Sequence, residues 1–180
     1  MINFRYVKFK NFLSTGNVVT NIQLDRSPNT LVIGENGAGK STMLDALCFA
    51  LFGKPFRKIK KSQLVNSVNL KDALVEVEFG IGRINYKIIR GLKPNKFEIY
   101  ANGKLLDQTA SVRDYQEYLE KNILKLNFTS FTQIVILGSS TFVPFMQLPA
   151  NQRREIIEDL LDIKIFTAMN ILLKEKVQSN

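Results

Sequence analysis

The sequence predicts an α/β fold built around a strand, a glycine-rich loop and a helix. Residues 31–33 form a short apolar run, and residues 34–41 read GENGAGKS, which matches the pattern G-x-x-x-x-G-K-[ST] in full. Two further patterns support this fold class. Residues 75–101 alternate apolar and polar side chains, as half-exposed strands do, and residues 153–176 repeat apolar side chains at helical spacing.

The chain begins with a predicted strand pair. Ile2, Phe4 and Tyr6 alternate with polar residues, which indicates a first strand with one face in water. Residues 11–17 (NFLSTGN) form a turn, and residues 18–24 supply the antiparallel partner strand. Pro28 and Asn29 then turn the chain into the run at 31–33, which we expect to be a buried strand that leads into the loop.

The loop has the composition of a phosphate-binding site. Gly37 and Gly39 can adopt backbone angles closed to other residues, and they let the main chain approach an anion. The loop N–H groups would face the phosphates at the positive end of the following helix. Lys40 would neutralise the β- and γ-phosphates, and the Ser41 hydroxyl would bind Mg²⁺. The residues expected to bind the nucleotide are Asn36, Gly37, Ala38, Gly39, Lys40, Ser41 and Thr42.

A buried helix is predicted directly after the loop. Apolar residues lie nearly all round it from Met43 to Leu51, and Gly53 and Pro55 end it. Cys48 lies within this helix and therefore reads as a small buried apolar residue. The alternative, a glycine-rich turn that binds nothing, does not explain why both the strand and the helix required by the motif are present.

Antiparallel strands follow a basic segment at residues 54–61, which carries five positive charges. The alternating stretches at 75–79, 84–88 and 97–101 predict a sheet with one solvated face, and Asn102-Gly103 is a hairpin turn signal. Ser111 and Asp114 resemble a capping box that starts a helix through residue 123. Asn127 is expected to cap a short helix at 128–131, and the apolar run 134–137 predicts a further strand.

The last part of the chain is predicted to be helical. Apolar residues form one face of a helix from Arg153 to about Leu161, and Ile163 interrupts it. Phe166, Met169 and Leu173 then follow heptad-like spacing, over too short a stretch to establish a coiled coil. We therefore expect one lobe over residues 1–149 and a helical segment over residues 150–180.

Composition narrows the function. The net charge of +9 favours a polyanionic partner, and the absence of histidine excludes His-based triads and His-ligated metal centres. No apolar run is long enough to span a membrane, and there is no signal-peptide pattern. The single cysteine favours a reducing, cytoplasmic compartment. If the function includes cutting nucleic acid, another chain is expected to do the cutting.

Several segments together resemble one family. The resemblance rests on five segments. They are NFLS near the start, the GENGAGKS loop, LDALCFALFGK directly after it, and the late segments FTQIVILGSSTFVPFM and QRREIIEDLLDI. The whole is similar to the N-terminal half of the SMC-like ATPases of DNA break repair, the Rad-fifty/SbcC type. The RREIIEDLLDI and FVPFM segments are most similar to the recombination-exonuclease ATPase subunits of T-even-like phages. The resemblance covers essentially the entire chain.

This resemblance implies the N-terminal lobe of an ABC-type P-loop ATPase head. The lobe would have a mixed core sheet around the P-loop helix and an antiparallel β subdomain, and would end in helices that begin a coiled coil. It implies the cofactors ATP and Mg²⁺, and a cytoplasmic location that is the host cytoplasm if a phage encodes the chain. The implied partners are the chain's own C-terminal ATPase lobe, a second copy of the head, a metallophosphoesterase nuclease subunit of the Mre-eleven/SbcD type, and DNA.

Two positions differ from the family pattern. Leu13 stands where family members often carry an arginine near the nucleotide. The Q-loop glutamine, which ligates Mg²⁺ in the family, corresponds by position to Ser139 and not to Gln133. Ser139 is therefore the second candidate metal ligand, and Gln133 is expected to be a polar residue at the end of a strand or helix.

The basic segment has two open interpretations, phosphate binding and a solvated loop. In the first, Lys58, Lys60 and Lys61 are candidate contacts to DNA phosphates, and Arg57 either approaches the nucleotide, as in related SMC heads, or also contacts DNA. The alternative is a solvated basic loop. Both interpretations remain open at this point because phosphate contacts carry no sequence code.

The preferred hypothesis is the ATP-binding half of a head in a DNA repair and recombination nuclease complex. Alternatives are a head fragment of a chromosome-organising SMC-type ATPase, an ABC ATPase of a transporter, and a self-sufficient P-loop kinase or GTPase. The chain has no acidic pair that ends an apolar strand and no signature motif. It is therefore expected to bind ATP without turning it over, and to act as an ATPase only in a complete head dimer.

Overall fold

The computed structural model describes residues 2–107, 111–136, 143–161 and 163–178 of the chain. It divides into two compact units, unit 1 (Met1–Glu117) and unit 2 (Tyr118–Asn180). Each unit is described by itself. The expected boundary between a lobe at 1–149 and a helical segment at 150–180 stays a prediction.

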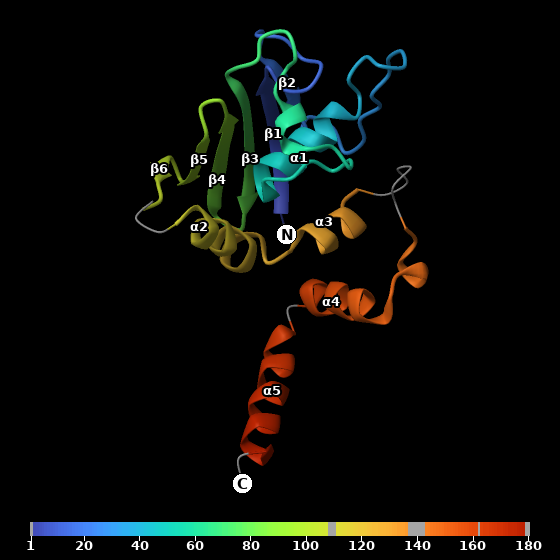
Figure 1. Ribbon diagram of the computed structural model, residues 1–180, viewed down its shortest axis with the longest axis vertical. Coiled ribbons are helices and arrows are strands. Elements are labelled where there is room, and N and C mark those ends of the chain that lie inside the picture. Colours follow the sequence, from blue (N-terminus) through green and yellow to red (C-terminus); the bar gives the residue numbers. More distant parts are fainter. Residues whose placement is uncertain (1, 108–110, 137–142, 162, 179–180) are drawn as a thin grey trace. The chain divides into compact units, whose positions relative to one another are not determined.

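Unit 1 contains a six-stranded antiparallel sheet in the order β2-β1-β3-β4-β5-β6 (Figure 1). Its strands are β1 (Ile2–Lys10), β2 (Thr20–Gln23), β3 (Ala73–Ile81), β4 (Ile84–Leu92), β5 (Lys96–Ala101) and β6 (Lys104–Leu105). The predicted strand pair at the start of the chain and the predicted hairpins are confirmed. The expected division into a mixed core sheet and a separate β subdomain is wrong for the described residues, because β1 pairs with β3 and all strands join one sheet.

The helix after the loop, α1 (Thr42–Phe52), packs on one face of this sheet (Figure 1). The inward faces of the central strands contribute Val7, Val75, Val77 and Ile88, all fully buried. The rings of Phe12 and Phe49 lie 5.5 Å apart between centroids. Burial of such a continuous apolar layer is what fixes α1, and therefore the loop before it, against the sheet.

An arginine ties the far end of α1 to the sheet. Arg90 of β4 donates from Nε to the carbonyl of Ala50 at 3.0 Å, and its guanidinium lies 3.7 Å from the ring centroid of Phe97. It also donates from Nη2 to Oε1 of Gln116 in α2 (Val112–Tyr118) at 2.6 Å. Gly53 ends α1 in the left-handed conformation at φ +68, as predicted for a helix C-terminus.

The segment before the loop differs from the prediction. Residues 31–33 form no strand, and Leu31, Val32 and Ile33 are 83, 46 and 83% exposed. A strand needs a neighbour to complete its backbone hydrogen bonds, and the described strands pair with one another in the order β2-β1-β3-β4-β5-β6 without this segment. The expectation of a buried strand here is therefore wrong for this chain.

Unit 2 is helical in its described residues. It contains a π-helical turn η2 (Leu119–Leu124), α3 (Phe128–Ile134), the short 3₁₀ turn η3 (Phe145–Gln147), α4 (Ala150–Leu160) and α5 (Lys164–Gln178). Asn127 caps α3 by accepting from the Ser130 N–H at 2.8 Å, as predicted. Ser130 Oγ in turn donates to Asp159 of α4, where both side chains are buried.

One predicted strand is a helix end in unit 2. Ile134 is the last residue of α3, and Val135 continues with helical backbone angles. The apolar run at 134–137 was ambiguous by length between strand and buried helix, and the Asn127 cap decides for the helix. Gln133 accordingly lies in the last turn of α3. No helix in the described residues has the length and apolar character needed to cross a bilayer.

Candidate nucleotide-binding site

The glycine-rich loop has the backbone geometry that anion binding requires. Gly37 and Gly39 have φ angles of +90 and +91, which only glycine adopts readily. The loop ends in a turn where the Thr42 N–H donates to the Gly39 carbonyl at 2.9 Å, and α1 begins at Thr42. The positive end of α1 therefore lies at the loop, as the motif predicts.

Lys40 is folded over its own loop. Its Nζ donates to the carbonyls of Gly34 at 2.5 Å and Glu35 at 2.7 Å. The two carbonyls hold the ammonium beside the loop, and among the described residues no carboxylate pairs with it. A phosphate group would offer Lys40 a stronger, charge-assisted hydrogen bond than these carbonyls do.

Ser41 is the described residue that best suits a magnesium ion. It precedes the first turn of α1, is exposed, and its hydroxyl makes no capping hydrogen bond to the helix. The described residues contain no cluster of three or more acidic, histidine or cysteine side chains, so the fit is to a metal held mainly by phosphate oxygens and water. Ser139, the second candidate ligand, lies outside the described residues.

A cavity of about 360 Å³ joins the loop to two other segments of unit 1. It is lined by Leu13, Ser14, Asn36, Gly37, Gly39, Lys40, Ser41, Thr42 and Arg57. All of the residues expected to bind the nucleotide therefore line one cavity, with the exception of Ala38. The volume is sufficient for the phosphates of a nucleotide at the loop.

The turn after β1 forms one wall of this cavity. Leu13 lies in this turn with a left-handed φ of +53. Its N–H donates to the Leu64 carbonyl at 2.7 Å, and its carbonyl accepts from Asn66 Nδ2 at 3.1 Å. The hydroxyl of the next residue, Ser14, lies close to the loop. Its Oγ is 3.7 Å from the position that a Cβ atom would take if Gly39 carried a side chain. Sequence reasoning missed Ser14 as a site residue, although its place in a tight polar turn was a usable signal.

Arg57 is held at the cavity by a buried carboxylate. Asp45, on α1, has no exposed surface. Its Oδ2 accepts from Arg57 Nε at 2.7 Å and Nη2 at 2.6 Å, and its Oδ1 accepts from the Arg57 backbone N–H at 2.9 Å. The structure thus places Arg57 in the cavity beside the P-loop, and its approach to a nucleotide stays a prediction. Asp45 itself was missed, because an acidic residue in a helix gives no sign of a partner twelve residues away.

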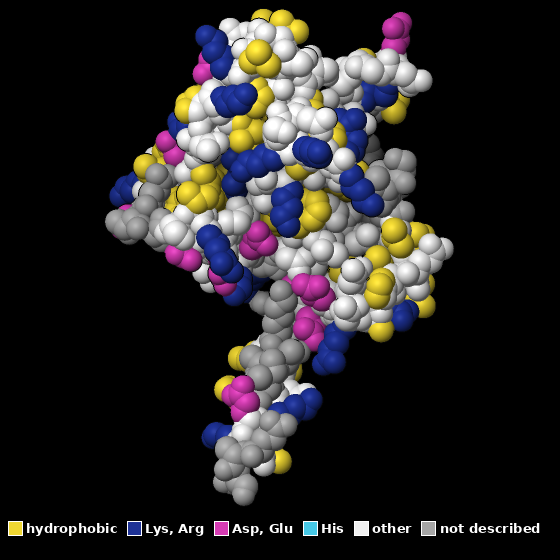
Figure 2. Space-filling view, in the orientation of Figure 1, with side chains coloured by type: hydrophobic (Ala, Val, Ile, Leu, Met, Phe, Trp, Pro, Cys, Tyr) yellow, Lys and Arg dark blue, Asp and Glu magenta, His cyan; other side chains and the backbone are white. Residues whose placement is uncertain are grey.

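The rest of the basic segment is exposed. Lys58, Lys60 and Lys61 all lie on the surface and line no part of the P-loop cavity. Lys61, at the start of the 3₁₀ turn η1 (Lys61–Leu64), borders a separate cavity of about 350 Å³ together with Lys93. Lys and Arg side chains are spread over the face of unit 1 that is seen in Figure 2. This placement is compatible with phosphate contacts and equally with solvation.

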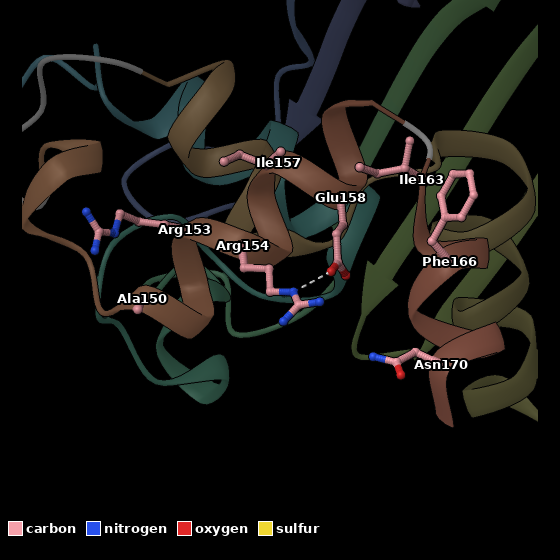
Figure 3. Close-up of a pocket in the computed structure, with 8 residues that line it drawn as sticks. All are labelled: Ala150, Arg153, Arg154, Ile157, Glu158, Ile163, Phe166 and Asn170. Carbon is pink, nitrogen blue, oxygen red and sulfur yellow. Dashed lines mark hydrogen bonds and ion pairs between the residues drawn. The ribbon is translucent and has the colours of Figure 1, made fainter. Parts of the chain in front are cut away.

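A further cavity, of about 540 Å³, lies at the junction of α4 and α5 in unit 2 (Figure 3). Arg154 and Glu158 form an ion pair at 2.8 Å on its α4 side. Ile163 and Phe166 border it from the start of α5. Arg154 is exposed, Glu158 is half-buried and the two are spaced i,i+4, so the pair mainly supports the local helix. The cavity holds no cluster of catalytic groups.

The cysteine is not a candidate nucleophile. Cys48 is fully buried in α1, and this burial, together with the nearby Asp45 carboxylate, raises the pKa of its thiol to about 12. A thiol that stays protonated at neutral pH is neither a nucleophile nor a metal ligand. The prediction of a buried, inert cysteine is confirmed in its burial.

Comparison with known proteins identifies the family of the chain. A family model described as AAA domain matches residues 6–180. The chain is 46% identical over 172 residues to exonuclease subunit 2 of Escherichia phage RB69, which covers 96% of this chain and 30% of the relative. It is 28% identical over 177 residues to a DNA double-strand break repair Rad50 ATPase of Thermoplasma volcanium, with 95% of this chain and 19% of that protein covered. The chain thus spans less than a third of the length of these relatives.

The fold also matches that of solved structures. An Smc head domain with an extended coiled coil, from Pyrococcus furiosus, superposes with a TM-score of 0.65 over 99% of this chain and 46% of that chain, at 21% identity. The expected α/β lobe of an ABC-type head is therefore confirmed as the fold class. The family model and the phage and archaeal relatives lead to one conclusion: the chain belongs to the AAA domain family, as a homologue of phage exonuclease subunit 2 and of the Rad50 ATPases.

Proposed function

We propose that this chain is the ATP-binding half of the ATPase head of a nuclease complex that acts in DNA double-strand-break repair and recombination. The observation that carries the proposal is the cavity that combines the positive-φ glycines of the loop with Lys40 and Arg57. Homology to an exonuclease subunit and to Rad50 ATPases supports the biological setting.

In this proposal the chain's own residues bind and orient ATP. The loop N–H groups and Lys40 hold the β- and γ-phosphates, and Lys40 exchanges the carbonyls of Gly34 and Glu35 for phosphate oxygens. Ser41 would hold Mg²⁺, with Ser139 as a further proposed ligand. The metal would neutralise phosphate charge, while Arg57 adds a second cation to the cavity.

The first proposed partner is the chain's own C-terminal ATPase lobe. Leu31, Val32 and Ile33 directly precede the loop, and their exposed apolar side chains and unpaired backbone are suited to pairing with strands of another segment. Such a strand would bury the apolar run and complete the sheet around the P-loop. A second copy of the head would then supply the groups that face the γ-phosphate from the opposite side.

The remaining proposed partners are a metallophosphoesterase nuclease subunit and DNA. The chain has no histidine and the described residues hold no metal cluster, so cutting would fall to another subunit. On α5, the exposed apolar side chains of Phe166, Met169 and Leu173 follow helix spacing and are suited to contact with another helix. That helix belongs either to a returning coiled coil or to the nuclease subunit.

The test is calorimetric titration of the 180-residue chain with ATP–Mg²⁺. We expect binding by the native chain and a loss of most affinity in Lys40→Ala, because a charge-assisted phosphate contact is worth about 1.5–3 kcal/mol. Lys96→Ala is the matched control, since it removes the same charge from β5. Equal affinity of the Lys40→Ala variant and the native chain would contradict the assignment of the loop.

A second candidate is a head fragment of a chromosome-organising SMC-type ATPase. The superposition on an Smc head favours it, because the P-loop chemistry is the same in both classes. The two proposals differ in the partner. Co-purification of the complete protein with a phosphoesterase subunit would support the nuclease complex, and co-purification with a non-nuclease bridging subunit would support the alternative.

A further inference from the structure

The buried ion pair between Asp45 and Arg57 is asymmetric. The Asp45 side chain is completely buried, whereas 42% of the Arg57 side chain is exposed. A carboxylate without contact to water depends on its partner for compensation of charge, because an uncompensated buried charge is strongly destabilising. The pair is therefore anchored at its aspartate end and free to face a ligand at its arginine end.

The hydrogen bonds from Arg57 to Asp45 fix the orientation of the guanidinium in addition to pairing its charge. The Asp45 carboxylate accepts hydrogen bonds from Arg57 Nε at 2.7 Å and Nη2 at 2.6 Å, and it also accepts from the Arg57 backbone N–H at 2.9 Å. Three donors on one carboxylate define both the plane of the guanidinium and the course of the chain that carries it. An arginine has five N–H donors, so the Nη1 group and the second hydrogen on Nη2 are left for a ligand.

The pair also lies close to Ser41, the proposed metal ligand. Asp45 follows Ser41 by one helical turn, and its N–H donates to the Ser41 carbonyl at 3.2 Å. Arg57 lines the same cavity as Ser41 and Lys40. Because the serine of this motif serves the metal that bridges the terminal phosphates, a cation anchored one turn away lies on the side of those phosphates.

We propose that Asp45 is a positioning residue that holds Arg57 as the second phosphate-binding cation of the P-loop cavity, and that this pair raises the preference of the site for a triphosphate over a diphosphate. The inference rests on the proposed nucleotide-binding function. Arg57 contacts the ligand, and Asp45 acts only through Arg57. The more negative charge the nucleotide carries, the more it gains from a cation that is already in place.

The proposal makes a prediction opposite in sign to simple electrostatics. Replacing Asp45 by Asn removes a negative charge close to the phosphates, so through-space attraction alone would make ATP bind more tightly. If Asp45 positions Arg57, the same change loosens the guanidinium, because Asn keeps only one of the two acceptor oxygens and no charge, and ATP binds more weakly. The sign of the change separates the two explanations.

The experiment compares ATP–Mg²⁺ and ADP–Mg²⁺ affinities of the 180-residue chain by calorimetry. In Asp45→Asn we expect ATP affinity to fall by about tenfold or more, the lower end of the cost of a lost charge-assisted contact, and ADP affinity to fall less. Asp114→Asn is the matched control, since it makes the same charge change at the cap of α2. A purely structural effect would lower the melting temperature and the fraction of binding-competent protein, and would leave the ratio of the two affinities unchanged.

Two further variants test whether Asp45 acts through Arg57. Arg57→Lys keeps the charge beside the buried carboxylate but lacks the planar fork, so it remains a valid test if Asp45→Asn does not fold. Asp45→Asn combined with Arg57→Gln removes both charges. If Asp45 works only through Arg57, all three variants lose a similar part of the ATP preference, and the double variant loses no more than the single ones.

The outcomes distinguish this inference from the function on which it rests. If the native chain binds no ATP, the proposed function fails. If the native chain binds ATP and both Asp45→Asn and Arg57→Lys keep the native ratio of ATP to ADP affinity, only the positioning role is overturned. Tighter ATP binding by Asp45→Asn would likewise overturn it, in favour of plain electrostatics.

Discussion

Burial from solvent decides which side chains along α1 are able to react or to bind a ligand. Lys40 and Ser41 lie at its exposed N-terminal end and are able to meet a ligand, whereas Cys48 is sealed two turns further along. The same helix thus carries a reactive end and an inert middle. The distinction follows from the buried face of the helix and not from the residue types alone.

At this scale we predict that Cys48 resists thiol reagents. Burial and the Asp45 carboxylate raise the pKa of the thiol to about 12, so the native chain is expected to react with a disulfide reagent at pH 8 only as fast as it unfolds. The measurement is labelling with and without urea. Rapid labelling of the folded chain would contradict both the burial and the raised pKa.

The same pKa predicts a dependence of stability on pH. Burial raises the pKa of Cys48 in the folded chain above its ordinary value of 9.0, so this contribution to the free energy of unfolding is complete below pH 9. It declines as the pH rises towards 12. Urea unfolding of the native chain and of Cys48→Ala between pH 8 and 10.5 would reveal it, as a steeper fall in the native chain than in the variant.

Residues of the loop were predictable because their chemistry is local. Gly37, Gly39, Lys40 and Ser41 stand at fixed spacing, and a few consecutive backbone angles place them together. Asp45 could not be found in this way, and Ser14 offered only the weaker signal of a tight polar turn. Their roles depend on contacts across a turn and across the cavity, which spacing along the chain does not encode.

At the scale of elements, residues 31–33 before the loop have the apolar sequence of a buried strand, but in the structure they are exposed and form no strand. We predict that Leu31→Ser combined with Ile33→Ser changes the free energy of unfolding of the chain by no more than about 0.5 kcal/mol, as is usual at exposed positions. Both side chains are 83% exposed. The same double variant should fail to associate with the C-terminal lobe, because the strand would lose its apolar face.

The measurements are urea unfolding and calorimetric titration with the C-terminal half of the complete protein. Val75→Ser is a control for unfolding, since Val75 is fully buried in β3 and its replacement should be costly. Native association by the double variant would show that residues 31–33 do not take part in the proposed interface.

The basic segment offers a second prediction for an element. If Lys58, Lys60 and Lys61 contact DNA phosphates, replacing all three by Ser weakens binding equally for unrelated duplex sequences. The slope of log affinity against log salt should decrease by up to about 0.9 for each lost phosphate contact.

The matched control replaces Lys87, Lys96 and Lys104 by Ser, which removes the same charge from β4, β5 and β6. Filter binding over a series of salt concentrations is the measurement. If both triple variants change the slope equally, the effect reports net charge, and the basic segment is only a solvated surface.

Elements were predictable where pattern and partner lie in the same stretch of chain. The alternation at 75–79 and 84–88 and the Asn102-Gly103 turn specify hairpins, and the structure forms them. The run at 31–33 failed because a strand needs a neighbour that the described residues do not offer. The strand predicted at 134–137 failed in its described part, residues 134–136, because a few apolar residues fit a helix end as well as a strand.

For the whole molecule, an inventory of groups leads to a prediction about turnover. The cavity supplies anion binding and one hydroxyl for a metal, but hydrolysis also requires a positioned water and stabilisation of the γ-phosphate from the far side. No residue of the cavity supplies either. We therefore expect the chain to bind ATP without hydrolysing it, and to hydrolyse ATP only with the C-terminal lobe added.

Phosphate release at steady state measures this. With the C-terminal lobe in trans, the rate should rise more than linearly with protein concentration, because two heads must meet. Turnover of about 1 per second by the chain alone, abolished by Lys40→Ala, would contradict the prediction, since that rate is typical of complete enzymes. It would identify a self-sufficient nucleotidase.

A charged side chain lies at each end of α1. The helix carries a partial positive charge at its loop end and a partial negative charge at its other end, where Arg90 donates to the Ala50 carbonyl. The guanidinium of Arg90 offsets part of the charge at the negative pole, while the carboxylate of Asp45 lies in the first turn at the positive pole and pairs with Arg57. Both ends of α1 therefore carry a charged side chain of the sign that the helix dipole favours, and Arg90 stabilises the end of the helix that lies opposite the cavity.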